Sequence, residues 1–315
     1  MNTLPVAACG SRQRRALVLS GGGSRAVWQV GACEHLIGEC GYWFDVIAGV
    51  SAGALNGAIL AQAHNPDELK AELERLRSIW FGVRGNDDVY GCGRLGPFGL
   101  LFGKRSGVYD ISPLRHIVFD HLDPPRVAAS SVALRVGYVD LLSRSYRTAG
   151  NEHPALVDAV LASCAVPVIF PPIPIRNGRE LGVDGGVRNV IPLLDVLTAL
   201  FERPAGDGPD EIWVLTPHRV CEMSESRFCG WPSIVRRCVS FLTNRAFVED
   251  IAQARQIHDS FRMVANQEGR RDATFRVLCP QQPLSGSCLD FHPGQLRRWY
   301  ADGVRTARHG EVTQV

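Results

Sequence analysis

The sequence lacks a long hydrophobic run. No window of about 18 uninterrupted apolar residues, the length a helix needs to cross a bilayer, occurs in its 315 positions. It also lacks a strong excess of either charge, since 34 Lys and Arg stand against 32 Asp and Glu. A formal net charge of +2 gives no strong bulk attraction to nucleic acid or to an anionic membrane. We therefore expect neither a membrane-spanning protein nor a nucleic-acid-binding one.

The ten cysteines lack the spacing of a metal site. They include no C-x-x-C pair and no Cys/His cluster of the zinc type. Most are predicted to be buried small hydrophobic residues with reduced thiols, and Cys221 with Cys229 is a candidate disulfide only if the protein is secreted. We expect no metal ion and no cofactor.

The amino-terminal residues lack a clear targeting signal. Residues 4–10 (LPVAACG) resemble a lipoprotein cleavage box, but nothing basic precedes them and the apolar run is too short for a signal peptide. We expect residues 1–13 to form a flexible leader and residues 14–310 to form one domain of a cytoplasmic protein. With 45% hydrophobic and 21% charged residues, and no internal repeat, the chain is long enough to bury the core of such a domain.

The most informative stretch is an apolar run that leads into Gly49-Val50-Ser51-Ala52-Gly53. This pattern is typical of a nucleophile elbow, in which a serine sits on a sharp turn between a strand and a helix. Glycine is needed at 49 and 53 because backbone and side chain nearly collide there. Ser51 is thus a candidate nucleophile at the amino end of a helix, and a glycine-rich turn with an incidental serine is the alternative.

A second glycine-rich stretch lies upstream. Residues 16–20 predict a buried strand that runs into Gly21, Gly22 and Gly23. Backbone N–H groups of such a loop approach a ligand closely, and Gly22 and Gly23 are candidates to hold the oxyanion formed when Ser51 attacks an ester. The alternative is a dinucleotide or phosphate site, which the serine elbow after the next strand disfavours although Asp45 lies near the usual distance of the acidic residue.

No histidine motif identifies the base that would activate Ser51. In α/β-hydrolases the elbow follows several strands, whereas here it follows a single one. His218 and His292 are candidates for a triad, but neither lies in a recognisable loop motif. Asp184 is the better candidate, because a carboxylate that ends an apolar strand and touches Ser51 directly would take its proton as general base. An Asp-Gly hairpin turn is the alternative.

Four stretches together resemble the patatin-like phospholipase family. In chain order they are Gly21-Gly22-Gly23-Ser24-Arg25, Gly49-Val50-Ser51-Ala52-Gly53, residues 162–172 (ASCAVPVIFPP) and Asp184-Gly185-Gly186. The resemblance covers roughly residues 15–305. It implies a three-layer α/β/α fold with a mostly parallel central sheet, and hydrolysis of lipid acyl esters by a Ser-Asp dyad without metal.

Carried over to this chain, the resemblance makes Ser51 the nucleophile, Asp184 the base and the N–H groups of Gly21, Gly22 and Gly23 the oxyanion donors. The supporting residues that it implies are Arg25, Gly49, Gly53, Gly185 and Gly186. Arg25 would stabilise the glycine loop or meet an anionic head group. Ala26 departs from the family, which normally has glycine there, and we expect a shift in loop packing with activity retained.

Residues 82–107 differ in composition from the rest of the chain. They are rich in glycine and apolar residues, are flanked by cations and fit no regular period. One interpretation is a mobile loop near the active site that dips into a lipid interface, which would make the protein peripheral to the membrane. A buried loop packed under the sheet is the alternative.

The remaining pattern predicts regular elements around these motifs. Strands are expected at 134–139, 145–148, 181–183, 211–215 and 274–278, and helices from Asn65, over 153–165, from Pro192 to about 200, between 232 and 267 and over 293–307. Four prolines between 167 and 174 are expected to force an extended path that delivers Asp184 to the serine.

The sequence leaves three functions open. The first is a phospholipase A or lysophospholipase type of esterase whose partner is a lipid or acyl-ester substrate. Acyl transfer to an acceptor other than water would use the same residues. The third is a catalytically silent module that binds lipid or phosphate, which the presence of both Ser51 and Asp184 disfavours. The oligomeric state stays open.

Overall fold

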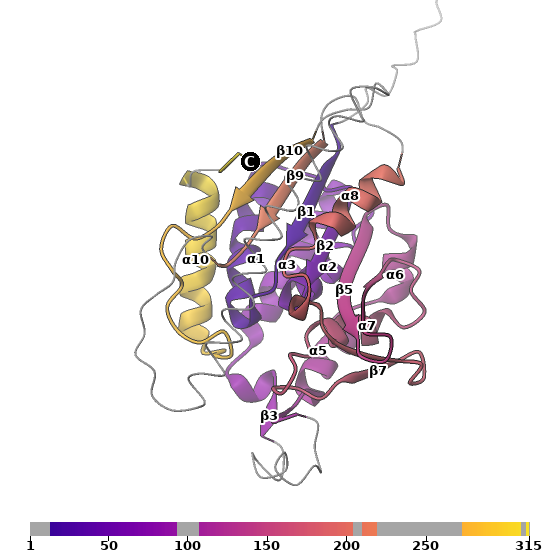
Figure 1. Ribbon diagram of the computed structural model, residues 1–315. Helices are drawn as coiled ribbons and strands as arrows, with labels where there is room; N and C mark the ends of the chain where they lie inside the picture. Colours follow the sequence, from indigo (N-terminus) through magenta and orange to yellow (C-terminus); the bar gives the residue numbers. More distant parts are fainter. Residues whose placement is uncertain (1–12, 93–106, 204–209, 219–272, 310–312, 315) are drawn as a thin grey trace, which may run out of the picture.

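The computed structural model describes residues 13–92, 107–203, 210–218, 273–309, 313 and 314. Within this part, helices lie against both faces of one central sheet (Figure 1). Most of the predicted leader, most of the loop at 82–107 and the helix predicted between 232 and 267 lie outside the described residues. No helix in the described ranges is long and apolar enough to span a bilayer.

The strands fall into one large sheet and one ribbon. The central sheet contains β1 (Arg15–Leu19), β2 (Val46–Val50), β5 (Ala133–Asp140), β6 (Ser145–Ala149), β7 (Ile173–Ile175), β8 (Glu180–Asp184), β9 (Asp210–Leu215), β10 (Ala273–Leu278) and β11 (Thr313–Gln314), and the ribbon contains β3 (Gly91–Cys92) and β4 (Tyr109–Asp110). The predicted strands are confirmed, while β3, β4, β7 and β11 were not predicted.

The helices confirm most of the sequence pattern. The α-helices are α1 (Val27–Cys33), α2 (Ala52–Leu60), α3 (Pro66–Gly82), α5 (Ser112–His121), α6 (Pro124–Ala129), α7 (Leu156–Ser163), α8 (Leu193–Phe201) and α10 (Pro293–His309). Shorter helical segments are η1 (Gly23–Ala26), η2 (Glu34–Glu39), η3 (Asn86–Asp88) and η4 (Gly185–Val187). As expected, Asn65 caps α3 by accepting a hydrogen bond from the Glu68 N–H at 2.9 Å.

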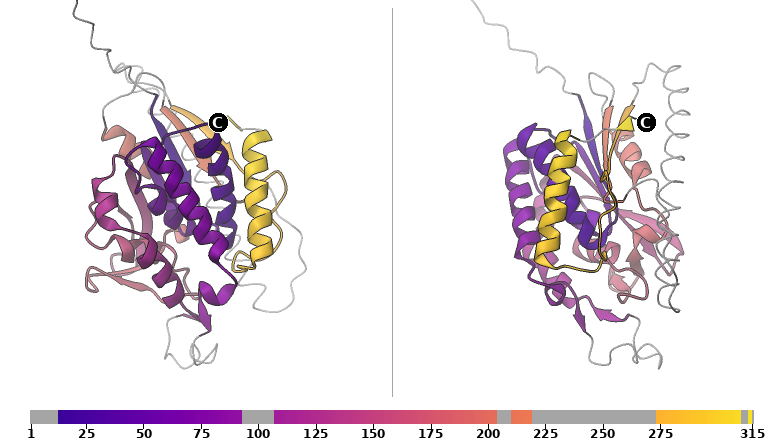
Figure 2. Two further views of the ribbon diagram at one scale, coloured as in Figure 1. Left: turned by 180° about the vertical axis from the view of Figure 1, so that it is seen from behind. Right: turned by 90° about the vertical axis from the view of Figure 1, so that its left-hand side faces the viewer.

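The expected three-layer fold is confirmed. The strand order is β11-β10-β9-β1-β2-β5-β8-β7, in which β10, β9, β1, β2 and β5 run parallel. Side chains of β1 alternate between the two faces: Leu17 and Leu19 pack with α1, α2, α3, α7 and α10, whereas Ala16 and Val18 pack with α8. Figure 2 shows α1, α3 and α10 gathered on one face of the sheet.

Strand β5 brings two distant strand ends together. β2 pairs with β5 from Ala133 to Gly137, and β8 pairs with it antiparallel from Tyr138 to Asp140. β6 pairs with β5 across both of these stretches, so it must occupy the opposite edge. β2 and β8 therefore meet end to end along a single edge of β5, with Val50 opposite Gly137 and Asp184 opposite Tyr138.

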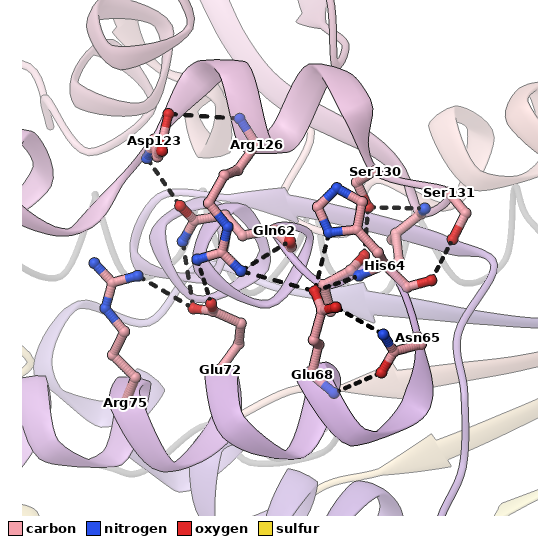
Figure 3. A network of polar contacts seen from close by, with 12 residues as sticks. Gln62, His64, Asn65, Glu68, Glu72, Arg75, Asp123, Arg126, Ser130 and Ser131 are labelled. Carbon is pink, nitrogen blue, oxygen red and sulfur yellow. Dashed lines mark hydrogen bonds and ion pairs between the residues drawn. The ribbon is translucent and has the colours of Figure 1, made fainter.

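A polar network fixes the end of α2 that is remote from Ser51 (Figure 3). The buried carboxylate of Glu72, on α3, forms an ion pair with Arg126 of α6, with 2.8 Å between Oε1 and Nη1. Gln62, just after α2, donates to the same carboxylate at 3.5 Å and accepts from the Asp123 N–H at 2.8 Å. Because α2 begins directly after the serine, this network stabilises the helix on which Ser51 depends.

Helices α1 and α10 cross with their backbones in close contact. A Cβ atom at Gly31 would lie 2.1 Å from the Tyr300 carbonyl oxygen, and one at Gly303 would lie 2.1 Å from the Trp28 carbonyl oxygen. Real Cβ atoms do not approach backbone so closely, so this crossing requires glycine on both helices.

Replacing Gly303 by alanine should force α10 away from α1. We expect Gly303→Ala to lower the free energy of unfolding by about 1–3 kcal/mol, the usual cost of overpacking. Gly82→Ala is the control, because a Cβ atom there meets nothing within 4 Å and should change stability by less than about 0.5 kcal/mol. Urea denaturation followed by tryptophan fluorescence measures both, and equal effects would contradict the packing argument.

Candidate active site

Ser51 occupies a strained turn between β2 and α2. Its φ of 58° and ψ of −136° lie in a region that L-residues rarely adopt, at a cost of about 1–3 kcal/mol. The chain can make this turn because a Cβ atom at Gly49 would lie 2.3 Å from the Gly53 carbonyl oxygen, and one at Gly53 would lie 2.3 Å from the Leu19 carbonyl oxygen. Only glycine fits at both positions, as the sequence pattern predicted.

The end of α7 holds the backbone of this strained serine. The Ser163 hydroxyl accepts the Ser51 N–H at 2.8 Å and donates to the Gly137 carbonyl at 2.6 Å. The neighbouring Cys164 thiol donates to the Ser51 carbonyl at 3.2 Å. Two consecutive side chains thus satisfy both backbone groups of Ser51, and one of them also ties the turn to β5.

Asp184 lies at the end of β8, with 4% of its surface exposed. Its carboxylate accepts the Gly186 N–H at 2.7 Å. Burial raises the pKa of Asp184 to about 6, although interactions with the Ser51 side chain and the Gly186 N–H oppose that shift. Near neutral pH the group is a buried carboxylate whose pKa responds to the serine side chain.

The stretch that holds Ser51 also holds Asp184. The Ala165 carbonyl accepts the Asp184 N–H at 2.9 Å, one residue after Cys164. A Cβ atom at Gly185 would lie 2.5 Å from the Gly137 carbonyl oxygen, so the turn after Asp184 also requires glycine. Residues 163–165 therefore fix the relative position of the two side chains. The family resemblance includes this stretch, within 162–172, but the sequence gives no sign of these contacts.

Cys164 is placed beside the pair but is unsuited to act as a nucleophile. Burial raises the pKa of its thiol, and the nearby Asp184 charge adds to that effect. The neutral thiol is the form that donates to the Ser51 carbonyl. This cysteine and Cys33 are buried, as predicted for most of the cysteines, whereas Cys279 is partly exposed and Cys40 and Cys288 are exposed.

The glycine loop approaches the same serine. A Cβ atom at Gly21 would lie 3.2 Å from the Ser51 Cβ. The Gly21 N–H is directed at the Val190 carbonyl, at 3.4 Å. In the described ranges the N–H groups of Gly22 and Gly23 have no such backbone acceptor.

Segments late in the chain support this loop, and the sequence pattern gave no signal for them. Gly23 adopts a φ of 56°, where a Cβ atom would lie 2.3 Å from the Cys288 carbonyl oxygen, and that carbonyl accepts the Ser24 N–H at 2.8 Å. Pro217 packs against Gly22, where a Cβ atom would lie 2.5 Å from its Cγ. The loop is therefore clamped between residues that follow β9 and residues that precede α10.

Arg25 contributes to the same clamp. Its Nη2 donates to the Gly286 carbonyl at 2.6 Å, while its Nε is buried without a hydrogen-bond partner among the described residues. Burial lowers the pKa of the guanidinium. Ala26, where the family normally has glycine, has helical dihedrals (φ −64°, ψ −13°), so its methyl group introduces no backbone strain.

The two histidine candidates have other hydrogen-bond partners than Ser51 and Asp184. His218 makes a hydrogen bond with the Gly21 backbone, and burial together with the Arg25 charge lowers its pKa to about 4, which keeps the ring neutral at pH 7. His292 accepts from the Gly294 N–H at 3.3 Å, at the start of α10. Neither ring is among the groups that shift the pKa of Asp184, whereas the Ser51 side chain is. Nor do the described residues hold a cluster of three or more metal-ligating side chains.

Comparison with known proteins identifies related sequences and folds. The family model for patatin-like phospholipases matches residues 17–197, more than half of the chain. An uncharacterized NTE family protein of Mycobacterium tuberculosis is 27% identical over 176 residues, which are 56% of this chain and 27% of that protein. The uncharacterized protein YqhO of Bacillus subtilis is 28% identical over 191 residues, 56% of this chain and 64% of its own.

The chain thus spans about a quarter of the mycobacterial relative and just under two thirds of YqhO. Among solved structures, VipD from Legionella pneumophila aligns with a TM-score of 0.43 at 14% identity, over 95% of this chain and 67% of that one.

Ser163 should be essential for the stability of the elbow. We expect Ser163→Ala to lower the free energy of unfolding by about 1–3 kcal/mol, because it removes the hydrogen bonds that join the buried Ser163 hydroxyl to the Ser51 N–H and the Gly137 carbonyl. Ser78→Ala is the matched control, since its exposed hydroxyl donates only to a carbonyl of its own helix. Thermal and urea unfolding of both variants provide the measurement, and a loss no larger than that of the control would refute the assigned role.

Proposed function

The chain belongs to the patatin-like phospholipase family, and from that premise we propose that it hydrolyses acyl esters of lipids with Ser51 as nucleophile and Asp184 as general base. The observation that supports this most directly is that the ends of β2 and β8 meet at adjacent residues of β5, which brings Ser51 to the buried Asp184, whose pKa its side chain lowers. A base must lie within hydrogen-bonding reach of the proton that it removes.

The first half-reaction transfers the acyl group to the serine. Ser51 Oγ attacks the ester carbonyl carbon while its proton passes to the Asp184 carboxylate. The tetrahedral intermediate then collapses, the bond to the leaving alcohol breaks, and Asp184 returns the proton to the departing oxygen. In the second half-reaction Asp184 takes a proton from water as the water oxygen attacks the carbonyl carbon of the acyl-serine. The bond to Ser51 Oγ then breaks, Asp184 returns the proton to that oxygen, and the fatty acid is released. Acyl transfer differs only in using another hydroxyl in place of water.

The negative charge of the intermediate requires donors on the glycine loop. We propose that the N–H groups of Gly22 and Gly23 supply them, since Gly21 is already directed at Val190. The amino end of α2, directly after Ser51, adds a favourable electrostatic potential at the same place. These fixed dipoles stabilise the charge as it forms.

The dyad predicts that each member is indispensable. We expect Ser51→Ala to abolish hydrolysis of a soluble ester such as p-nitrophenyl butyrate, and Asp184→Asn to lower kcat/KM by about 10²–10⁴-fold. Asp158→Asn, on α7, is the control for loss of a partly exposed carboxylate. Product analysis with phospholipid, lysophospholipid and a neutral acyl ester identifies the substrate and separates release of free acid from acyl transfer. Near-normal rates in Asp184→Asn would assign the base to another group.

The pH dependence of activity should follow the raised pKa of Asp184. We expect kcat/KM to fall about tenfold per pH unit below about pH 6 and to level off above it, because only the carboxylate accepts the serine proton. A profile flat from pH 5 to 8 would contradict this assignment.

The free energy of unfolding should also depend on the ionisation of Asp184, but it should fall as the pH rises, whereas activity should increase. The folded-state pKa lies above the unfolded value, so the stabilisation is full below about pH 4 and is lost as the pH rises through about 6. The difference amounts to about 3 kcal/mol. Asp184→Asn lacks this loss, so its stability relative to the parent should rise by that amount between pH 4 and 7. Urea titrations at both pH values measure the change, and a constant difference would contradict it.

A further inference from the structure

We propose that two adjacent turns form a docking face for the surface of an anionic phospholipid bilayer. The docking face comprises residues 141–144, between β5 and β6, and residues 176–179, between β7 and β8. The assignment of a lipid as the partner rests on the proposed function. The positions of the residues in the docking face do not depend on the roles of Ser51 and Asp184.

The two turns lie next to each other at the end of the sheet where Ser51 lies. The Leu141 N–H donates to the Leu181 carbonyl at 2.9 Å, which joins the start of one turn to the strand that follows the other. β5 continues for three residues beyond Gly137, the register partner of Val50. At the rise of a strand, the turn after it projects roughly 10 Å past the level of the elbow.

The turn after β5 presents two leucines to solvent. Leu141 is 45% exposed and Leu142 is 60% exposed. Val168 and Val187 are also exposed large hydrophobic residues, in segments that flank Asp184 at the same edge. Isolated apolar side chains are ordinary on a surface, but an adjacent pair at the end of a projecting hairpin provides the shape needed to enter a lipid interface.

A buried carboxylate holds this leucine turn in place. Asp140 is 2% exposed and accepts the N–H groups of Leu142 at 3.1 Å, Ser143 at 3.2 Å and Leu181 at 3.0 Å. The Ser143 hydroxyl donates to the same carboxylate at 2.5 Å. The leucines are thus displayed by an ordered turn, and docking would cost little conformational entropy.

The charges of the docking face favour an anionic partner. Arg144 and Arg147 are exposed in the first hairpin, and Arg176 and Arg179 are exposed in the second turn. The acidic residue beside them, Glu180, is paired with Arg176 at 3.2 Å. Two leucines surrounded by arginines match a bilayer surface, in which acyl chains lie beneath anionic head groups that attract nearby cations.

The decisive experiment compares vesicle binding with turnover of a soluble ester. The full chain and the Leu141→Ser/Leu142→Ser variant are co-sedimented with phosphatidylcholine vesicles containing about one third phosphatidylserine. We expect the variant to bind the vesicles at least about tenfold more weakly than the parent. Arg144→Gln/Arg179→Gln should weaken binding at low salt and little at high salt. Both should hydrolyse p-nitrophenyl butyrate at the parental rate.

The control and the remaining outcomes keep the proposal separate from the proposed function. Phe201→Ser removes a side chain that is 47% exposed at the end of α8. This residue lies near the start of β1, at the opposite end of the strands, so the variant should bind vesicles like the parent. Parental binding by the leucine variant would overturn the docking face even if esterase activity is present. A change from dimer to monomer on gel filtration would overturn it as well, because the face would then be a self-interface. Vesicle binding without any ester turnover would uphold the docking face and refute the proposed function.

Discussion

The site depends on one constraint, the meeting of β2 and β8 along a single edge of β5. β2 ends at Val50 opposite Gly137, and β8 ends at Asp184 opposite Tyr138, the next residue of β5. Because the strands arrive from opposite directions, the residue that leaves β2 and the residue that ends β8 lie at the same point of the sheet. No histidine is needed to bridge them. The backbone register alone places the hydroxyl beside the carboxylate.

This arrangement is locally unfavourable, and the surrounding residues offset its cost. Ser51 has a strained backbone and Asp184 is a buried carboxylate whose pKa is raised by desolvation. Against these terms stand the hydrogen bonds that the Ser51 N–H donates to the Ser163 hydroxyl, that the Cys164 thiol donates to the Ser51 carbonyl, and that the Asp184 N–H donates to the Ala165 carbonyl. The three residues at and just after the end of α7 thus restrain both groups. Without these bonds the strained turn at Ser51 would be free to relax.

The sequence predicted the elements that follow local rules. The glycines around Ser51, the capped start of α3 and the apolar strands all express steric or periodic requirements of neighbouring residues, and each is found in the structure. What it could not provide are contacts that depend on tertiary register. The Val190 carbonyl accepts the Gly21 N–H, and the Ser163 hydroxyl accepts the Ser51 N–H although the two residues are 112 positions apart in the sequence. His218 illustrates the same limit, since its position beside Gly21 follows from strand order and not from any motif.

The glycine loop shows why the site extends beyond the stretch that defines the family. The family match ends at residue 197, yet Pro217, Gly286 and Cys288 all contact the loop. A positive φ at Gly23 and free rotation at three successive glycines would leave this segment poorly ordered by itself. The Cys288 carbonyl fixes Gly23 and Ser24 from one side, and Pro217 confines Gly22 from the other. Since the proposed oxyanion donors act only when they are held in place before charge develops, Pro217, Gly286 and Cys288 belong to the proposed site.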